Sequence, residues 1–528
     1  MKEIDALKKY LPQTPAAKHW DKIGIFHHHG IVIPLFSLRC ENSSGIGEFL
    51  DLKKVIDWCK NIGFDVIQLL PLNETGQDPS PYNAISSCAL NPIHISLYAL
   101  DKVNENIPLK EKLNEFKIFN SYNKYHYLQL KNLKLDFLYQ YYLFIYDDLI
   151  KDSNFHLFIK NNPWLEEYGL FRAIEEEQNY KNWDQWPLEL QNINPQSKSK
   201  YIEKYQNKIQ FYFALQYFCF SQLTEVKKYA DEHNILIFGD VPILLSKNSC
   251  DVWYNRSFFD TNFVAGAPPD NYNFFGQRWG FPLYNWDELK KSDYHWFKRR
   301  LDSITSIYHM YRIDHVVGFF RIWAMHVNET ATEGRFLPQN PSEWERHGID
   351  HLLMMLNFSA LLPIAEDLGL IPKIVYKTLR NLGICGTKIV PWQKTHLNFL
   401  RLNKYNPLSL ISLSTHDSNT FALWWKNYPE EANKLAKLKN WSYAPDLSYS
   451  QRKEILYDVH HNSSIFHVNL LQEYLALYPE LVWENLEDER INVPGTTNPI
   501  NWTYRFKPTF EQIMNHTKLN DDLKEILS

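Results

Sequence analysis

Acidic side chains lie at or near the ends of several apolar runs in this sequence, where they could do acid–base or nucleophilic chemistry. The runs are ILIFGD with Asp240, YRIDHV with Asp314, LLPIAED with Glu366 and Asp367, and LISLSTHD with Asp417. A single acid at a strand end often only caps the next helix. The repetition of this pattern along one chain favours a shared site over several unrelated caps.

Basic residues accompany these acids. Arg312 lies two residues before Asp314, so both side chains lie on the same face of an extended strand. His315 follows Asp314 directly, and His416 precedes Asp417. Carboxylates that share a pocket repel one another, and arginine or histidine would reduce that repulsion. The pattern therefore predicts a screened cluster of carboxylates.

Carboxylates on neighbouring strands form a workable set for cleaving a glycosidic bond. One carboxylate attacks the sugar carbon, while a second, kept protonated, gives its proton to the leaving oxygen. In retaining glycosidases these two groups lie about 5–5.5 Å apart. A third carboxylate can stabilise the positive charge on the ring carbon. Water or another sugar hydroxyl then opens the covalent intermediate, so the trio alone does not separate a hydrolase from a transferase.

The elements that must position these acids are short apolar runs separated mostly by amphipathic helical stretches. The runs are 31–36, 65–70, 235–240, 311–316, 361–367, 386–392, 410–417 and 481–487. Buried strands alternating with helices are typical of a parallel α/β sheet, and eight such units predict a (β/α)8 TIM barrel. In such barrels the carboxyl ends of the strands form the active-site face, so the acids would converge there.

The uneven spacing of the runs predicts large, mostly helical insertions. The expected parts are an N-terminal extension at 1–30 and a catalytic barrel at 31–528, with helical insertions at about 93–234 and 418–480 and an active-site loop insertion at about 246–290. The last insertion contains a Pro-, Gly- and aromatic-rich stretch at 262–286, which we expect to be a long functional loop.

Composition excludes several classes of protein. The net charge is −5, from 56 Lys and Arg against 61 Asp and Glu, so we expect no nucleic-acid partner. Six cysteines lie far apart without a CxxC pair, which argues against a disulfide scaffold and fits a reducing cytoplasm. The sequence has no secretion signal and no uncharged apolar stretch of about 18 residues, so we expect a cytoplasmic protein with no membrane contact.

A run of three histidines, His27, His28 and His29, could suggest a metal site. Consecutive residues point to different sides of the chain, and neither an acid nor a cysteine stands at ligand spacing. We therefore predict no metal site here. We also predict no organic cofactor, because carboxylates alone can supply both the nucleophile and the proton.

Longer motifs resemble one enzyme family. RIDHVVGFFRIW (312–323), AEDLG (365–369) and THD (415–417) resemble, in order, the nucleophile, acid/base and third-carboxylate segments of the α-amylase clan. The segments that narrow the resemblance are SSGIGEF (43–49), LPLNETGQDPSPYNAISSCALNP (70–92), FGDVPILLSKNSCDVW (238–253), VAGAPPDNYNFFGQRWGFPLYNW (264–286) and NVPGTTNPINWTYR (492–505). They are similar to the amylomaltase, or 4-α-glucanotransferase, family of disproportionating enzymes. The branch with the plant cytosolic enzyme is the most similar.

This resemblance implies a retaining 4-α-glucanotransferase that acts on α-1,4-glucans. It implies that Asp314 is the nucleophile, Glu366 the general acid/base and Asp417 the transition-state stabiliser. Further implied substrate-binding residues are Arg312, His416, Asp240, Trp279, Gln277, Tyr82, Ser80 and His315. Maltose, maltodextrins and glycogen outer chains stay open as donors, and the oligomeric state stays open too. A hydrolase of the same clan and a catalytically silent glucan-binding protein are the alternatives.

Overall fold

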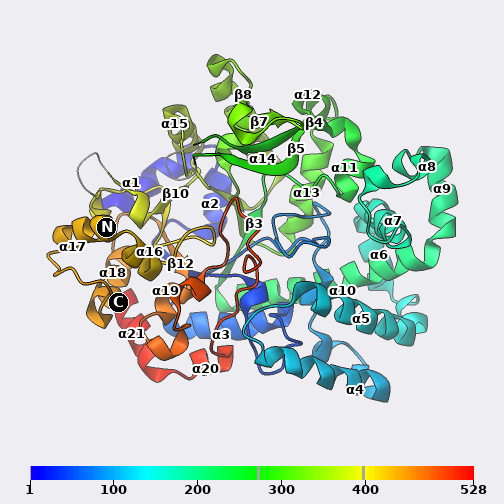
Figure 1. Cartoon of the computed structure of the whole chain (residues 1–528), viewed down its shortest axis with the longest axis horizontal. Coiled ribbons are helices and arrows are strands. Elements are labelled where there is room, and N and C mark those ends of the chain that lie inside the picture. The colour runs from blue at the N-terminus through cyan, green and yellow to red at the C-terminus, as the bar shows by residue number, and fades with distance from the viewer. Residues whose placement is uncertain (1, 270–273, 395–398) are drawn as a thin grey trace.

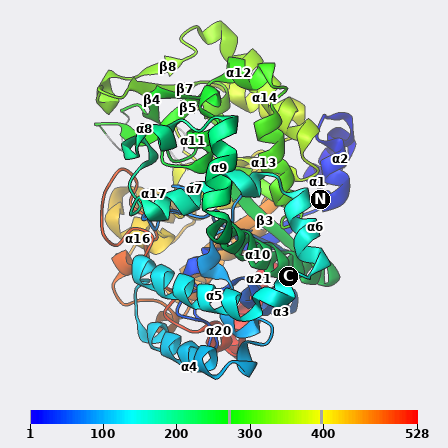
Figure 2. The ribbon, with the colours of Figure 1, turned by 90° about the vertical axis from the view of Figure 1, so that its right-hand side faces the viewer.

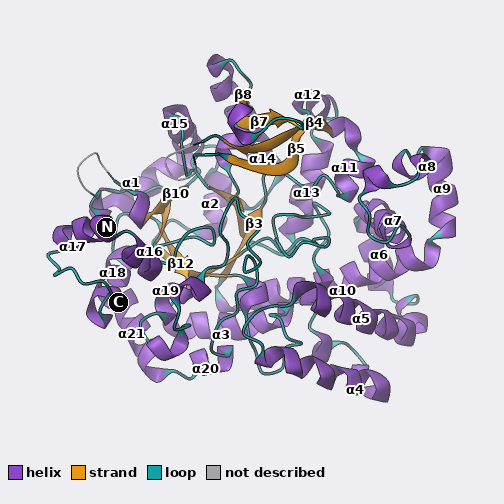
Figure 3. Cartoon of the chain, viewed as in Figure 1, coloured by secondary structure: helices purple, strands orange, loops and turns teal. Residues whose placement is uncertain are grey.

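A parallel barrel forms the centre of the structure. The computed structural model describes residues 2–269, 274–394 and 399–528, and within them eight parallel strands form one sheet (Figure 1, Figure 3). In sheet order the strands are β10 (Gly386–Ile389), β11 (Ser409–Ser412), β12 (Phe466–Leu470), β1 (His28–Ile33), β2 (Val66–Leu69), β3 (Leu236–Val241), β6 (Met310–Ile313) and β9 (Leu362–Ala365). The two outer strands also meet, because the Ala365 amide donates to the Cys385 carbonyl at 2.7 Å. The predicted (β/α)8 barrel is thus confirmed.

One of the eight predicted strands was wrong. Residues 481–487 run from the end of one 3₁₀ turn, Pro479–Leu481, to the start of another, Leu486–Glu489. The eighth strand is β12, inside the stretch predicted to be helical at 418–480. The β12 sequence, FHVNL, escaped notice because two of its five residues are polar. Asn469 is nevertheless fully buried. Its Oδ1 accepts from the Leu413 amide at 2.9 Å, and this hydrogen bond stabilises the polar side chain in the interior.

Helices surround the barrel on its outer side (Figure 1). The first group is α1 (Lys2–Tyr10), α2 (Ala17–Ile23), α3 (Leu52–Ile62), α4 (Ile107–Glu115), α5 (Tyr127–Leu149), α6 (Ser153–Asn161), α7 (Trp164–Glu177), α8 (Leu188–Gln191), α9 (Pro195–Lys204) and α10 (Gln206–His233). The second group is α11 (Cys250–Tyr254), α12 (Trp286–Lys291), α13 (His295–Thr305), α14 (Trp344–Phe358), α15 (Lys373–Leu382) and α16 (Phe421–Asn427). The last group is α17 (Pro429–Leu438), α18 (Tyr449–His460), α19 (Leu471–Leu475), α20 (Phe510–Met514) and α21 (Thr517–Leu527).

Helix α3 illustrates why these segments fold as they do. Leu52, Val55, Ile56 and Cys59 recur at helical spacing, and all four are buried on the face toward the barrel. The helix ends at Gly63, whose φ of +106° places it in the left-handed region that favours glycine. The same local pattern, an apolar stripe followed by a C-terminal glycine, predicts the helix from the sequence.

The helices between β2 and β3 lie together on one side of the barrel. Helices α4 to α10 occupy the stretch 93–234, and Figure 2 looks onto this side, with α5, α7 and α10 toward the viewer. Helix α10 packs against both α3 and α7, so it joins this group to the barrel. The boundaries of the insertions as separate units stay predictions. Among the described residues, none of the helices combines the length and the apolar character needed to span a lipid bilayer.

A second sheet replaces the predicted long loop at 262–286. Strands β4 (Phe259–Ala267) and β5 (Gln277–Tyr284) form an antiparallel hairpin, which β7 (Ile322–His326) and β8 (Arg335–Leu337) extend to four strands. The hairpin tip, 270–273, lies outside the described residues. The strands approach closely at Gly266, where a Cβ would stand 2.0 Å from the Gln277 carbonyl oxygen. The glycine and proline content of 262–286 had predicted a long loop, and that prediction was wrong. Gly266 instead permits the close approach of an irregular pair of strands.

Candidate active site

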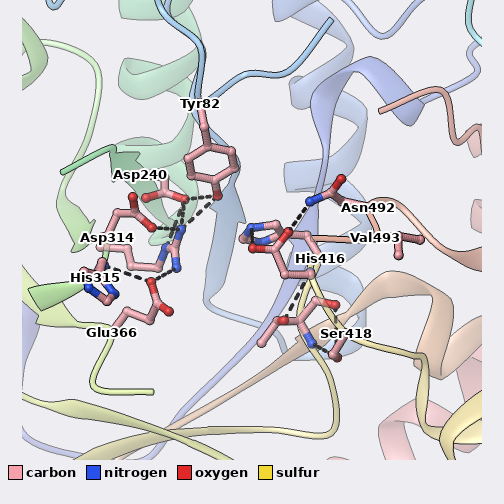
Figure 4. A network of polar contacts seen from close by, with 12 residues as sticks. Tyr82, Asp240, Asp314, His315, Glu366, His416, Ser418, Asn492 and Val493 are labelled. Atoms are coloured by element: carbon pink, nitrogen blue, oxygen red, sulfur yellow. Dashed lines mark hydrogen bonds and ion pairs between the residues drawn. The ribbon is translucent and has the colours of Figure 1, made fainter. Parts of the chain in front are cut away.

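Three carboxylates and an arginine meet at the carboxyl ends of neighbouring barrel strands. Asp240 lies on β3 and pairs in register with Arg312 on β6. Asp314 directly follows β6, and Glu366 directly follows β9. Figure 4 shows Asp240, Asp314 and Glu366 gathered on one side of the site. The apolar strands are parallel and adjacent, so the barrel itself brings these acids together.

The Arg312 guanidinium contacts all three of these carboxylates. Its Nη1 lies 2.8 Å from Glu366 Oε2, and its Nη2 lies 3.1 Å from Asp314 Oδ1. The same Nη2 lies 2.8 Å from Asp240 Oδ2. One positive charge therefore faces up to three negative charges, which favours protonation of one of the acids.

Glu366 is the acid whose environment favours the proton. Burial raises its pKa to about 8, Arg312 opposes that shift and the neighbouring Asp314 adds to it. Its Oε2 already accepts from Arg312 Nη1 and, at 2.9 Å, from the His315 amide. The other carboxyl oxygen, Oε1, is thus the one left to carry the proton. His315 can present its amide because its backbone is left-handed, with φ of +44°.

Asp417 lies across the site, in the loop that follows β11. Desolvation alone would raise its pKa, but His416, the Asn492 amide and Arg312 together lower it to about 2. Asn492 Nδ2 donates to Asp417 Oδ1 at 2.7 Å, and His416 Nε2 lies 3.3 Å from Oδ2. The environments thus separate the pKa values of Glu366 and Asp417, so that one holds a proton while the other stays ionised.

Two residues that sequence reasoning did not single out hold the Asp417 loop. The Asn492 amide donates to the His416 carbonyl at 3.1 Å, in addition to its side-chain contact with Asp417. Glu473, on α19, is buried and accepts from the Ser414 hydroxyl and from the Phe421 amide. Asn492 is the first residue of the family-like segment 492–505, and this was the one feature of the sequence that could have indicated it. No sequence pattern indicated Glu473.

Tyr82 connects the two halves of the site. Its hydroxyl donates to Asp240 Oδ2 at 2.7 Å and accepts from Arg312 Nη2 at 2.8 Å. Its ring stacks on His416 with centroids 5.1 Å apart (Figure 4). Trp502 packs against the same two rings. Tyr82 is therefore a structural part of the site as well as a candidate glucan contact.

The remaining predicted binding residues lie around this centre to different degrees. Trp279, on β5, packs edge-to-face on His315 at 4.9 Å, and its indole N–H donates to Gln277 Oε1 at 3.0 Å. The Ser80 amide donates to Asp78 Oδ1 at 2.8 Å, a contact within its own loop. The structure thus brings Trp279 against His315, next to Asp314.

Both halves face one cavity. Arg312 and Glu366 line it on one side, and Thr415 and His416 line it on the other. Apolar residues of the barrel strands, such as Leu470 on β12, also line it. A sugar bound here would lie between a protonated acid and an ionised carboxylate, an arrangement suited to glycosyl transfer.

Comparisons with known proteins agree with this chemistry. A protein-family model described as 4-alpha-glucanotransferase matches residues 33–511. The 4-alpha-glucanotransferase of Chlamydia pneumoniae is 44% identical over 98% of this chain and 99% of its own length. The rice protein 4-alpha-glucanotransferase DPE2 is 24% identical, over 94% of this chain and 69% of its own. The amylomaltase of Streptococcus agalactiae, solved with acarbose, has the same fold, with a TM-score of 0.79 at 24% identity over 95% of this chain and 99% of that one.

Proposed function

The chain belongs to the 4-alpha-glucanotransferase family, and from this premise we propose that Asp314, Glu366 and Asp417 carry out the transfer. The activity is that of the family: cleavage of an α-1,4-glucan and transfer of the glucanosyl segment to the 4-hydroxyl of another sugar, with retention. The observation that supports these roles is the Arg312 guanidinium, which holds the Asp314 and Glu366 carboxylates together at 3.1 and 2.8 Å.

In the first step Asp314 attacks C1 of the donor sugar. The bond from C1 to the bridging oxygen breaks, and Glu366 gives its proton to that oxygen, so the leaving glucan departs neutral. Asp314 is well placed for attack because Arg312 contacts its Oδ1 and the Ile243 amide donates to its Oδ2 at 3.2 Å. The product is a glycosyl ester on Asp314 with inverted configuration.

In the second step an acceptor sugar opens this ester. Glu366, now ionised, takes the proton of the acceptor 4-hydroxyl as its oxygen attacks C1, and Asp314 leaves as a carboxylate. The second inversion restores the α configuration. Asp417 stays ionised across both steps and stabilises the positive charge that develops on the sugar ring.

Transfer in place of hydrolysis requires that water be kept from the ester while an acceptor binds. The β4–β5 hairpin carries Trp279 against His315, next to the catalytic strand end. Tyr82 connects the two halves of the site, because its hydroxyl contacts Asp240 and its ring stacks on His416. These contacts support a role for the hairpin and the Tyr82 segment as lid and acceptor platform. Maltose, maltodextrins and glycogen outer chains are the candidate donors.

We also place the protein in the cytoplasm, since all six cysteines are free and buried.

Incubation with maltotriose alone tests the function. We expect a ladder of longer maltodextrins together with glucose, at a constant number of reducing ends, measured by chromatography over time. If maltose and glucose alone accumulate while reducing ends rise, the chain hydrolyses glucans. If purified, folded protein leaves maltotriose and longer maltodextrins unchanged, the silent glucan-binding alternative is favoured.

The pH dependence of kcat/KM follows from Glu366. Because its pKa is raised to about 8, the general acid keeps its proton at neutral pH and loses it as pH rises through about 8. We therefore expect activity on maltotriose to fall on the alkaline side with a midpoint near 8. A profile from pH 4 to 10 measures this, and an alkaline limb near pH 5 would contradict the assignment.

Asn492→Ala should weaken catalysis without removing a catalytic group. The change removes the hydrogen bond to the Asp417 carboxylate, and hydrogen bonds to charged groups contribute about 1.5–3 kcal/mol. We expect kcat/KM to fall about ten- to a hundredfold, and the pKa of Asp417 to rise. A pH profile of the variant detects that shift as an acid limb at higher pH. Asn485→Ala, an exposed cap in the same region, is the matched control and should leave both unchanged.

A further inference from the structure

Three histidines meet near the amino-terminal ends of strands β1 and β12, away from the carboxylates. His29 comes from β1, His467 from β12 and His460 from the end of α18. The His29 and His460 Nδ1 atoms lie 2.9 Å apart, and the His29 and His467 Nδ1 atoms 3.3 Å apart. One ring nitrogen from each of the three lies within 4.8 Å of the others. We propose that His29, His460 and His467 form a binding site for a zinc-class divalent cation.

The hydrogen bonds of His460 leave a lone pair on its Nδ1, the form of the ring that can bind a metal. The Tyr474 hydroxyl has one proton, which it donates to the Gly30 carbonyl at 3.0 Å. Its oxygen therefore accepts from the His460 Nε2–H at 2.8 Å. This sets the tautomer of His460, with a bare lone pair on Nδ1. Metal-bound histidines usually donate their other ring N–H to such a partner.

Hydrogen bonds among the three neutral rings do not pair all of the ring nitrogens that face one another. His29 can donate its Nδ1 proton to His460, but then it has none to spare for His467. His467 is fully buried, and its Nε2 has no hydrogen-bond partner among the described residues, so its Nδ1 is its one polar contact. If His467 Nδ1 carried a proton, that proton would face the one on His29. A cation between the three rings would instead accept a lone pair from each.

The geometry suits zinc. Zinc–nitrogen bonds of about 2.0–2.1 Å in a tetrahedron place the ligand atoms about 3.3 Å apart. The separation of the His29 and His467 Nδ1 atoms matches this distance, and His460 would need only a small shift. Three imidazoles leave a fourth position for water. Neutral imidazole favours Zn²⁺, Cu²⁺ and Ni²⁺ over Mg²⁺ and Ca²⁺, which prefer oxygen.

The surroundings favour a cation. His460 and His467 are buried, and metal binding requires the neutral form of each ring, which burial away from water favours. Asp65 adds negative charge nearby, since its Oδ1 accepts from the His29 amide at 2.8 Å. His29 is only partly buried, which gives an ion a route from solvent.

The position of the site predicts its effect. Strand β1 is the first of the barrel in the chain and β12 the last, and they pair in register at His29 and His467. A cation held by both strands and by α18 would link the beginning and the end of the barrel. We therefore expect the ion to stabilise the fold without taking part in glucan transfer.

Zinc binding to the untagged full-length protein tests the proposal. Equilibrium dialysis against Zn²⁺ at micromolar concentration, with metal measured by mass spectrometry, should give one equivalent bound at pH 7.5. His29→Gln and His467→Gln should each lose the bound zinc, because their affinity for Zn²⁺ should fall by about a hundredfold or more. His461→Gln is the matched control, because that ring bonds to the Ile526 carbonyl outside the cluster, and it should keep the ion.

Two further readouts keep the result decisive. Zn²⁺ should raise the Tm of the wild type and of His461→Gln but not of His29→Gln, whose partly exposed site makes it the variant least disturbed by the change. Co²⁺ in place of Zn²⁺ should give the visible absorption of a four-coordinate site. Failure of the wild type to bind Zn²⁺, or retention of the bound equivalent by folded His29→Gln, would overturn the proposal.

Discussion

Asp314→Asn should abolish glucan transfer, with kcat on maltotriose falling by about 10⁴-fold or more. An asparagine amide keeps the size of the side chain but cannot attack C1, and it carries no charge to pair with Arg312. The loss should fall on the first chemical step, so activated donors such as α-maltosyl fluoride should not restore it. Product chromatography from maltotriose and from the fluoride measures both.

The Asp314 variant needs a folded protein and a matched control. Circular dichroism and Tm should stay close to the wild-type values, because Asp314 is partly exposed and lies after its strand. Asp287→Asn changes an exposed aspartate on α12 and should leave activity intact. If Asp314→Asn retained more than about 1% of the wild-type activity, another residue would be the nucleophile.

Glu366→Gln should lower turnover of maltotriose by about 10²–10⁴-fold, the usual contribution of a general acid or base. Unlike the Asp314 variant, it should still react with α-maltosyl fluoride, since fluoride leaves without a proton. The second step then lacks its base, so the glycosyl-enzyme should accumulate. Mass spectrometry of the intact protein, followed by peptide mapping, should locate the added maltosyl group on Asp314.

Azide separates the two roles by stereochemistry. In Glu366→Ala, azide needs no base and attacks the ester on Asp314, so it should give α-maltosyl azide after two inversions. In Asp314→Ala, azide would replace the nucleophile and give β-maltosyl azide after one inversion. The opposite pattern would exchange the two assignments. Absence of a covalent intermediate in Glu366→Gln, despite turnover of the fluoride, would count against the double displacement.

Much of the fold and the centre of the site could be predicted from the sequence, because both rest on local patterns. Apolar runs and amphipathic stretches gave seven of the eight barrel strands and the helical stretch 93–234. The two-residue spacing of Arg312 and Asp314 predicted that their side chains share a face of extended chain, and in the structure they form an ion pair at the end of β6. Parallel strands then bring acids from distant parts of the chain to one edge, so the convergence of Asp240, Asp314 and Glu366 follows from the strand pattern.

The contacts that depend on distant partners were decided by the tertiary structure alone. Strand β12 contains Asn469, whose burial is stabilised because its side chain binds the Leu413 amide and the Tyr474 hydroxyl. Asn492 reaches Asp417, 75 positions away, and His460 lies next to His29 across 431 positions. Local sequence records hydrophobicity and periodicity, but a buried polar group is stabilised by its partner, and the partner is known only once the chain has folded.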